Sequence, residues 1–235
     1  MLSVLIGLVV AIGAVVQGVV GFGMALIATP LLALLDPALV PVPLLLLSSV
    51  HSVLTLGREH RQADWPGVGW ATLGRAAGTV LGVYAVTQLS TNGLSIVVAL
   101  SVLLCLGLSL LFWRPRPGAP SLVIAGAAGG ATGTAAGIGG PPVALLYQHA
   151  DGAKLRATMG AYFVIGSILS IVGLAIAGAV TTEAMQAAAV LLPFMLAGFL
   201  LSGPVRRVLD AGWIRPTVLA VSGVSAVALL VKALI

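Results

Sequence analysis

The sequence predicts an all-α integral membrane protein made of two inverted repeats, each a broken, re-entrant helix hairpin followed by three transmembrane helices. Composition is the first reason: of 235 residues, 60% are hydrophobic and 7% are charged, whereas soluble domains carry about 25% charge. The mean hydropathy is +1.18. Second, the apolar runs exceed the ten or so residues of a barrel strand and do not alternate with polar residues. Third, two of the runs contain glycine-rich interruptions.

The first apolar run, Leu2–Leu35, is too long for one membrane crossing. As a single helix it would measure about 51 Å, against a bilayer core of about 30 Å. It is interrupted by Gln17-Gly18-Val19-Val20-Gly21-Phe22-Gly23. Because glycine disfavours a helix interior, we expect residues 2–35 to form a hairpin. The run has no basic leading segment and no clear cleavage site, so we expect it in the mature protein.

Three unbroken apolar runs follow, at residues 38–56, 67–88 and 93–113. Each has about the length of a transmembrane helix. A polar loop at 57–66 and a short turn at 90–92 separate them. The basic, proline-rich segment at 114–120 is interpreted as the linker between the repeats.

The second interruption, Gly130–Pro142, lies within the apolar run 121–149. Glycine costs about 1 kcal/mol and proline about 3 kcal/mol relative to alanine in a helix interior, so this stretch should break the helix. Lipid cannot satisfy the freed N–H and C=O groups, so protein or a water-filled cavity must surround the break. Pro141 suits the first turn of a new helix, whose positive end would point at the break and attract anions.

Three further runs, 155–179, 183–201 and 213–235, complete an internal repeat of residues 1–113 and 121–235. Gly21-Phe22-Gly23 aligns with Gly137-Ile138-Gly139. The third spans align more weakly, as Gly78-Thr-Val-Leu-Gly82 with Gly198-Phe-Leu-Leu-Ser202. The alternative is that glycine-rich helices resemble one another by composition alone.

Loop charges decide how the broken runs cross the membrane. Of the eleven Lys and Arg residues, all but Arg75 lie in loops or near helix ends. If every run crosses once, these ten divide evenly between the two faces, contrary to the positive-inside rule. If both broken runs return as hairpins, only Lys232 falls on the opposite face. We therefore expect both termini outside, the basic loops in the cytoplasm, and an inverted second repeat. Such repeats with paired interruptions are typical of secondary transporters.

The two interruptions also carry a family resemblance. Gly21-Phe22-Gly23, the Gly-Ile-Gly-Gly-Pro-Pro stretch at 137–142 and the Gly-x-x-x-Gly third spans resemble the TauE/SafE family of sulfite and organosulfonate exporters, over nearly the whole chain. The resemblance implies a permease of the bacterial cytoplasmic membrane that exports small sulfur-containing anions such as sulfite or sulfoacetate. It leaves the exact substrate and the direction of transport open.

We expect the substrate site near the membrane midplane, between the two interruptions. Close backbone approach to the substrate would come from Gly21, Gly23, Gly137, Gly139, Gly140 and Pro141. Gln17 could hold freed backbone groups and donate its amide to an oxyanion. Thr134 could donate a hydroxyl, although threonines often bond to their own helix.

Two ionisable residues complete the candidate site. An arginine at the bilayer centre costs about 2.5–3.5 kcal/mol, so Arg75 should face protein or water, or reach the cytoplasmic headgroups. We expect it to gather anions on the cytoplasmic side. His51 is a candidate carrier of a coupling proton, because an ordinary histidine titrates near neutral pH. An interhelical polar contact is the alternative for His51.

Other functions find less support in the sequence. The net charge of +5 is scattered over short loops, which is typical of membrane orientation rather than nucleic-acid binding. A single cysteine, Cys105, excludes an intrachain disulfide or a multi-cysteine metal site. No motif for nucleotide, metal or serine-nucleophile chemistry occurs, so we expect no enzyme activity, cofactor or metal. A passive anion channel is the main alternative. The expected partners are a small anion and the lipid bilayer, and a homodimer is left open.

Overall fold

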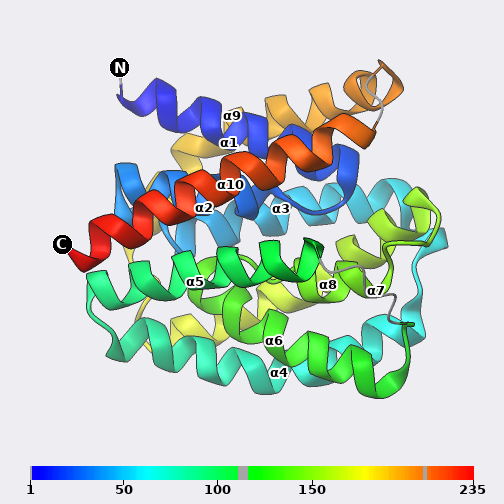
Figure 1. Ribbon diagram of the computed structural model, residues 1–235, viewed down its shortest axis with the longest axis horizontal. Coiled ribbons are helices and arrows are strands. Elements are labelled where there is room, and N and C mark those ends of the chain that lie inside the picture. Colours follow the sequence, from blue (N-terminus) through cyan, green and yellow to red (C-terminus); the bar gives the residue numbers. More distant parts are fainter. Residues whose placement is uncertain (1, 111–115, 209–210) are drawn as a thin grey trace.

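The computed structural model describes residues 2–110, 116–208 and 211–235, and within these ranges every regular element is helical (Figure 1). The elements in chain order are α1 (Leu2–Val20), α2 (Met24–Leu35), η1 (Pro37–Leu39), α3 (Val42–Glu59), η2 (His60–Gln62), α4 (Trp65–Gln88), α5 (Thr91–Leu110), α6 (Ala119–Ala136), α7 (Pro141–Leu146), α8 (Gly152–Ile176), α9 (Thr182–Val208) and α10 (Ala211–Leu234). The predicted all-α fold is confirmed. Part of the predicted linker, including Arg114, lies outside the described residues.

The helices have the lengths and the surface of a membrane protein. Four segments in the described ranges are long and apolar enough to cross a bilayer: Leu2–Val20, Pro37–Gln62, Gly152–Ile176 and Thr182–Arg206. Large apolar side chains also cover the outside of the bundle, and the most exposed include Val80, Ile124, Ile176 and Val224. Contiguous apolar surface of this kind is costly in water and favourable in lipid. The chain is therefore a multi-pass membrane protein.

One predicted boundary is wrong. The sequence placed the end of a helix at residue 201 and a basic loop from Pro204, but α9 continues through Pro204 to Val208. Proline fixes φ near the helical value, so a helix can continue through it at the loss of one backbone hydrogen bond. The side chains of Arg207 and Arg215 lie outside the described part of the chain.

Helices of the two halves pack against each other in matched pairs. The third span of the first half, α4, packs along the broken helix of the second half, α6, and α9 packs along α1 in the same way. The second spans, α3 and α8, pack together, as do the last helices, α5 and α10. The interface between the halves therefore contains both broken helices.

Glycines set the closest of these contacts. A Cβ at Gly74 or Gly78 of α4 would overlap the carbonyl oxygen of Val123 or Ala127 on α6. The Gly-x-x-x-Gly spacing thus forms a close packing face, and its partner is α6. Small residues allow backbones to approach in this way where lipid supplies no hydrophobic drive between helices.

The basic side chains gather at one end of the bundle. Both termini lie at one end, whereas α3 ends and α4, α6 and α8 begin at the other (Figure 1). We call the second end the basic end, because these helix ends and loops carry Arg58, Arg61, Arg116, Lys154, Arg156 and Arg206. Lys232 lies at the opposite end, where its Nζ donates to the carbonyl oxygen of Leu34 at 3.0 Å.

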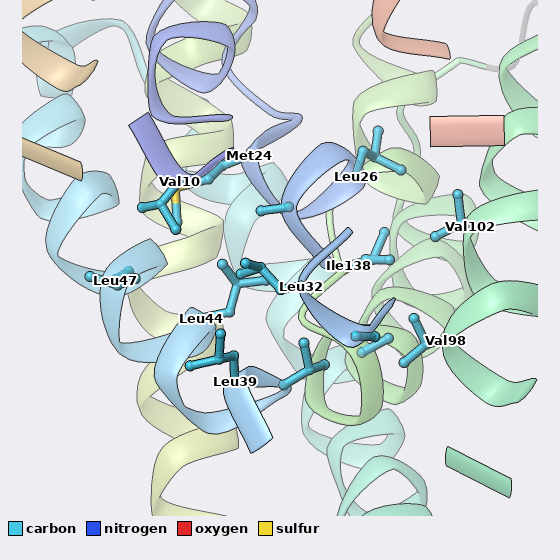
Figure 2. Packing of buried hydrophobic residues seen from close by; sticks show 14 of the residues in the cluster. Val10, Met24, Leu26, Leu32, Leu39, Leu44, Leu47, Val98, Val102 and Ile138 are labelled. Atoms are coloured by element: carbon cyan, nitrogen blue, oxygen red, sulfur yellow. The ribbon is translucent and has the colours of Figure 1, made fainter. Parts of the chain in front are cut away.

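The largest apolar cluster surrounds the short helix α2 (Figure 2). Met24, Leu26 and Leu32 of α2 pack with residues of α1, α3 and α5. Ile138, in the second helix break, is inserted into the same cluster and is 1% exposed. The core thus holds both breaks in place from the side of α2.

Candidate functional site

Two helix breaks interrupt the bundle, as the sequence predicts. The first separates α1 from α2 at residues 21–23, where Gly23 adopts φ 128°. The second separates α6 from α7 at residues 137–140, where Gly137 adopts φ 73° and is the C-cap of α6. These left-handed conformations favour glycine at both positions.

Direct contacts join the two breaks. The Thr29 hydroxyl on α2 donates to the carbonyl oxygen of Ala136 at 2.9 Å, which satisfies a group freed at the end of α6. A Cβ at Gly140 would lie 3.3 Å from Cβ of Phe22, so the two loops touch. The breaks are therefore one site, although their residues are more than a hundred positions apart in the chain.

A small enclosed cavity lies between the breaks. The cavity has a volume of about 20 Å³, which is room for one water molecule. Seven of the residues predicted for the site line this cavity: Gln17, Gly23, Arg75, Gly137, Gly139, Gly140 and Pro141. The remaining wall includes Phe22, Ala25, Leu26, Leu45, Ser48, Ile138, Phe163 and Ser167.

Arg75 is the charged residue in the wall of this cavity. It lies ten residues after Trp65, so its Cα is about 15 Å along α4, and its side chain is 2% exposed. Its guanidinium carbon stands 4.7 Å from the ring centre of Tyr162 on α8. Of the alternatives expected for Arg75, the side chain therefore faces protein and does not reach the cytoplasmic headgroups. Packing of α4 against α6 and α8 encloses the side chain in protein before it can reach the surface.

Three glycines make room for the guanidinium group. A Cβ at Gly139 would lie 2.7 Å from Nη1 of Arg75, and one at Gly133 would lie 3.0 Å from Nη2. A Cβ at Gly166 on α8 would overlap Nε and Cζ. Side chains at these positions would displace the charged group, so the glycines define where it sits.

The positive charge of Arg75 has no counterpart among the described residues. Nε and Nη1 are buried without a hydrogen-bond acceptor, and the Tyr162 hydroxyl also lacks a partner. No carboxylate among the described residues forms an ion pair with this arginine. A buried charge left unpaired costs several kcal/mol. The arrangement is therefore suited to bind an anion.

Helix α2 adds a smaller attraction for anions. Its first turn begins beside the cavity, and the first amides of a helix have no partner within the helix. The second restarting helix, α7, contributes less than the sequence suggested. It is only six residues long, and Pro141 and Pro142 have no N–H group to donate.

Gln17 and His51 form a buried pair at the edge of the cavity. The ring Nε2 of His51 lies 3.0 Å from the carbonyl oxygen of Ala14 and must donate to it. In the neutral ring Nδ1 is then an acceptor, and Nε2 of Gln17 donates to it at 3.1 Å. Gln17 lines the cavity and His51 does not. His51 therefore acts on the cavity only through Gln17.

Besides His51, two predicted site residues do not line the cavity. Gly21, with φ 95°, lies against Arg156 at the start of α8. Thr134 is fully buried, and its hydroxyl is hydrogen-bonded to Ser170 at 2.8 Å and to Thr79 at 3.4 Å. Thr134 therefore satisfies its hydrogen bonds at the interface of α4, α6 and α8, and we leave it out of the site.

Sequence reasoning missed the contributions of α3 and α8. Ser48 comes from α3, and Phe163 and Ser167 come from α8. The serine at 48 interrupts a leucine-rich run and is a polar signal that could have been noticed. Nothing local distinguishes Gly166 from the other glycines of α8, because its importance comes from Arg75 on another helix.

A second cavity lies between this site and the basic end. It has a volume of about 80 Å³ and is lined by residues at the end of α1, on α7 and at the start of α8: Val20, Phe22, Pro141, Ala144, Leu145, Gln148 and Leu155. Phe22 and Pro141 line both cavities. They therefore separate the central cavity from the one nearer the basic end.

The basic end of α7 is anchored to α4. The Tyr147 hydroxyl donates to Oδ2 of Asp64 at 2.9 Å, and Oδ1 of Asp64 accepts from the amide of Gly67 in the first turn of α4. Burial raises the pKa of Tyr147, as does its bond to the carboxylate. This hydrogen bond ties the end of α7 to the start of α4.

The chain was compared with known proteins. It matches the family described as sulfite exporter TauE/SafE over residues 5–229. Searches of curated proteins and of solved structures found no match. The family match includes both helix breaks, Arg75 and every helix that lines the cavity. The chain therefore belongs to the TauE/SafE family of sulfite exporters, a family of membrane transporters.

Proposed function

We propose that this protein is a secondary transporter of small sulfur-containing anions, which bind to Arg75 between the two helix breaks. The observation that carries the proposal is the buried guanidinium group, whose Nε and Nη1 have no acceptor in the described part of the chain. A bound oxyanion supplies the missing negative charge and acceptor oxygens. The first turn of α2 and the amide of Gln17 complete the ligand set.

The size of the cavity favours a small oxyanion. In this conformation it holds about one water molecule, so even sulfite, with four heavy atoms, requires the walls to separate. Phe22 and Phe163 are the bulky side chains that approach the second break. Their rotation admits a compact anion with less rearrangement than a longer organosulfonate would need.

The two halves are proposed to be inverted repeats that move against each other. The packing of α4 on α6 and of α9 on α1 is the pairing that a twofold axis between the halves would produce. Rocking of one such half against the other opens a central site to alternate sides. By the positive-inside rule, the basic end faces the cytoplasm of a bacterial cell and both termini face outward.

His51 is proposed to couple proton and anion binding. A protonated ring donates from both nitrogens, so Gln17 must turn its amide oxygen toward Nδ1 and its NH₂ group toward the cavity. The groups around the ring are Gln17 and Ala14 of α1, Thr55 and Arg58 of α3, and Phe199 of α9, with no carboxylate among them in the described structure. Protonation therefore favours anion binding, and the direction of flux follows the two gradients.

The test is transport of labelled sulfite by purified protein in proteoliposomes. We expect saturable flux, acceleration by unlabelled sulfite on the opposite side, and flux driven by an imposed pH gradient. Arg75→Gln should reduce flux by at least about tenfold, because it removes charge-assisted hydrogen bonds of about 1.5–3 kcal/mol. Flux without counterflow would indicate a channel, and loss of the pH response alone would exclude the role of His51.

A stability measurement separates binding from folding. Sulfite at 100 times its Kd should stabilise the purified protein by about 2.7 kcal/mol. The Arg75→Gln protein should melt at the same or a higher temperature, because an unpaired charge is removed, and should no longer respond to sulfite. A sulfite response that survives in this variant would place the anion elsewhere.

A further inference from the structure

A second cluster of arginines lies at the basic end. Glu59, at the end of α3, is held by Arg156 of α8 with Nε–Oε2 and Nη2–Oε1 distances of 2.9 Å, and by Arg206 of α9 with an Nη1–Oε1 distance of 2.8 Å. Arg58, next to Glu59, places its guanidinium carbon 3.9 Å above the ring centre of Phe199. Three helices thus bring three arginines and one carboxylate together around one small cavity.

This cluster carries more positive charge than its structural contacts require. Arg58 forms no ion pair with a carboxylate in the described part of the chain. Three guanidinium groups and one carboxylate therefore line one small cavity, which leaves a surplus of two positive charges around it. Two other carboxylates lie at this end. Asp64 is bonded to Tyr147 and to the amide of Gly67, and Asp151, which precedes α8, forms no ion pair within the described residues.

The cavity of this cluster is built of polar and small groups. It is lined by Gly18, Thr55, Arg58, Glu59, Arg156, Phe199, Ser202, Gly203 and Arg206. Arg58 is exposed and the Arg206 side chain is 44% exposed, whereas the Arg156 side chain is 13% exposed. Two of the three arginines are therefore accessible from the basic end, and the third is held in place by Glu59.

The arginine cluster also lies next to the first helix break, which borders the central cavity. A Cβ at Gly21 would lie 2.9 Å from Cγ of Arg156. The next residue, Phe22, is the side chain that separates the central cavity from the one nearer the basic end. Arg156 therefore contacts the residue that directly precedes Phe22 in the chain.

We propose that Arg58, Arg156 and Arg206 form a loading site that binds the same class of small oxyanion before it passes to Arg75. The proposal rests on the proposed transport of anions. In the absence of substrate, the Glu59 carboxylate lies where the oxyanion would bind. When the oxyanion binds, it interacts with Arg206 in place of Glu59 and also with Arg58. Competition with Glu59 keeps the affinity modest, and a site on a transport path must release its ion as readily as it binds it.

The test compares two single charge removals at the basic end. Arg58→Gln and the control Arg61→Gln remove the same charge three positions apart, and Arg61 lies in the exposed turn η2. Sulfite flux is measured from each face of proteoliposomes in which the protein has one orientation. Arg58→Gln should raise the KM for sulfite applied at the basic end about tenfold, the effect of one lost charge-assisted hydrogen bond. The KM from the other face should not change, and Arg61→Gln should shift either KM by less than about twofold.

A second variant gives a change in the opposite direction. Glu59→Gln removes the competing carboxylate and should lower the KM at the basic end several-fold, a gain that a misfolded protein would not show. Equal effects of Arg58→Gln and Arg61→Gln, or equal changes at both faces, would overturn the loading site while the central site stands. Absence of sulfite flux in the wild-type protein would instead overturn the proposed transport itself.

Discussion

At the scale of single residues, the main feature is a guanidinium group buried among glycines. Arg75 meets backbone rather than side chains at Gly133, Gly139 and Gly166. The absence of these side chains leaves Nε and Nη1 without an acceptor among the described residues, as the proposed anion site requires. An unpaired buried charge costs stability, and such a cost is a common compromise between stability and function.

Gly166→Ala tests this arrangement. The three atoms nearest to the added Cβ all belong to the Arg75 side chain, so we expect the guanidinium group to move out of the cavity while the backbone stays in place. We expect sulfite transport to fall at least tenfold, on the order of one lost charge-assisted hydrogen bond, with a melting temperature close to that of the wild type. Flux assays and thermal unfolding check the two parts of this prediction.

Gly160→Ala is the matched control on the same helix. A Cβ at Gly160 would lie 3.5 Å from the nearest atom of Leu56, which is ordinary contact. Transport by this variant should therefore equal that of the wild type. Equal activity of the two alanine variants would show that the position of Arg75 is not critical.

At the scale of elements, the two restarting helices are unequal. Helix α2 has twelve residues and a first turn open to the cavity, whereas α7 has six and begins with two prolines. Val143 of α7 is packed in an apolar cluster and does not line the cavity. A carboxylate introduced at Val143 would mainly disturb this apolar packing. Ala25 does line the cavity, so it is the better position at which to test the effect of a negative charge.

The contact between α4 and α6 yields a prediction about stability. Gly78→Ala would drive a Cβ into the carbonyl oxygen of Ala127, which forces two backbones apart and should cost about 1–3 kcal/mol. The control is Gly69→Ala on the same helix, where no atom lies within 4 Å and alanine gains up to about 1 kcal/mol in helix propensity. Thermal unfolding in detergent should show opposite shifts. If Gly78→Ala left the melting temperature unchanged, α4 and α6 would have to be farther apart than described.

At the scale of the whole molecule, the arrangement of the helix ends predicts sidedness. Asp36 and Gly178 lie in turns at the end that carries both termini, and Arg116 and Gly152 lie at the basic end (Figure 1). Single cysteines at these positions, in a background lacking Cys105, should divide into two classes. A membrane-impermeant maleimide should label positions 36 and 178 in intact cells and positions 116 and 152 only after lysis. External labelling of position 152 would contradict the inverted orientation of the second half.

The sequence by itself determined the class of the molecule and the places where its helices break. Composition and the length of the apolar runs require a helical membrane protein, because only helices satisfy their own backbone in lipid. The interruptions at residues 21–23 and 137–140 follow from glycine and proline chemistry, which is local. Five of the residues predicted for the site, in or beside the breaks, line the cavity for the same reason, because residues in a break cannot lie against lipid: Gly23, Gly137, Gly139, Gly140 and Pro141.

Only the tertiary structure decided what the breaks enclose. The position of Arg75 depends on the packing of α4 against α6 and α8, and no local pattern records that contact. The same holds for Gly166, for the orientation of Thr134 away from the cavity, and for the assembly of Glu59, Arg156 and Arg206 from three helices. Local propensity acts within a few residues, whereas burial, unpaired charge and the shape of a cavity arise between helices that are distant in sequence.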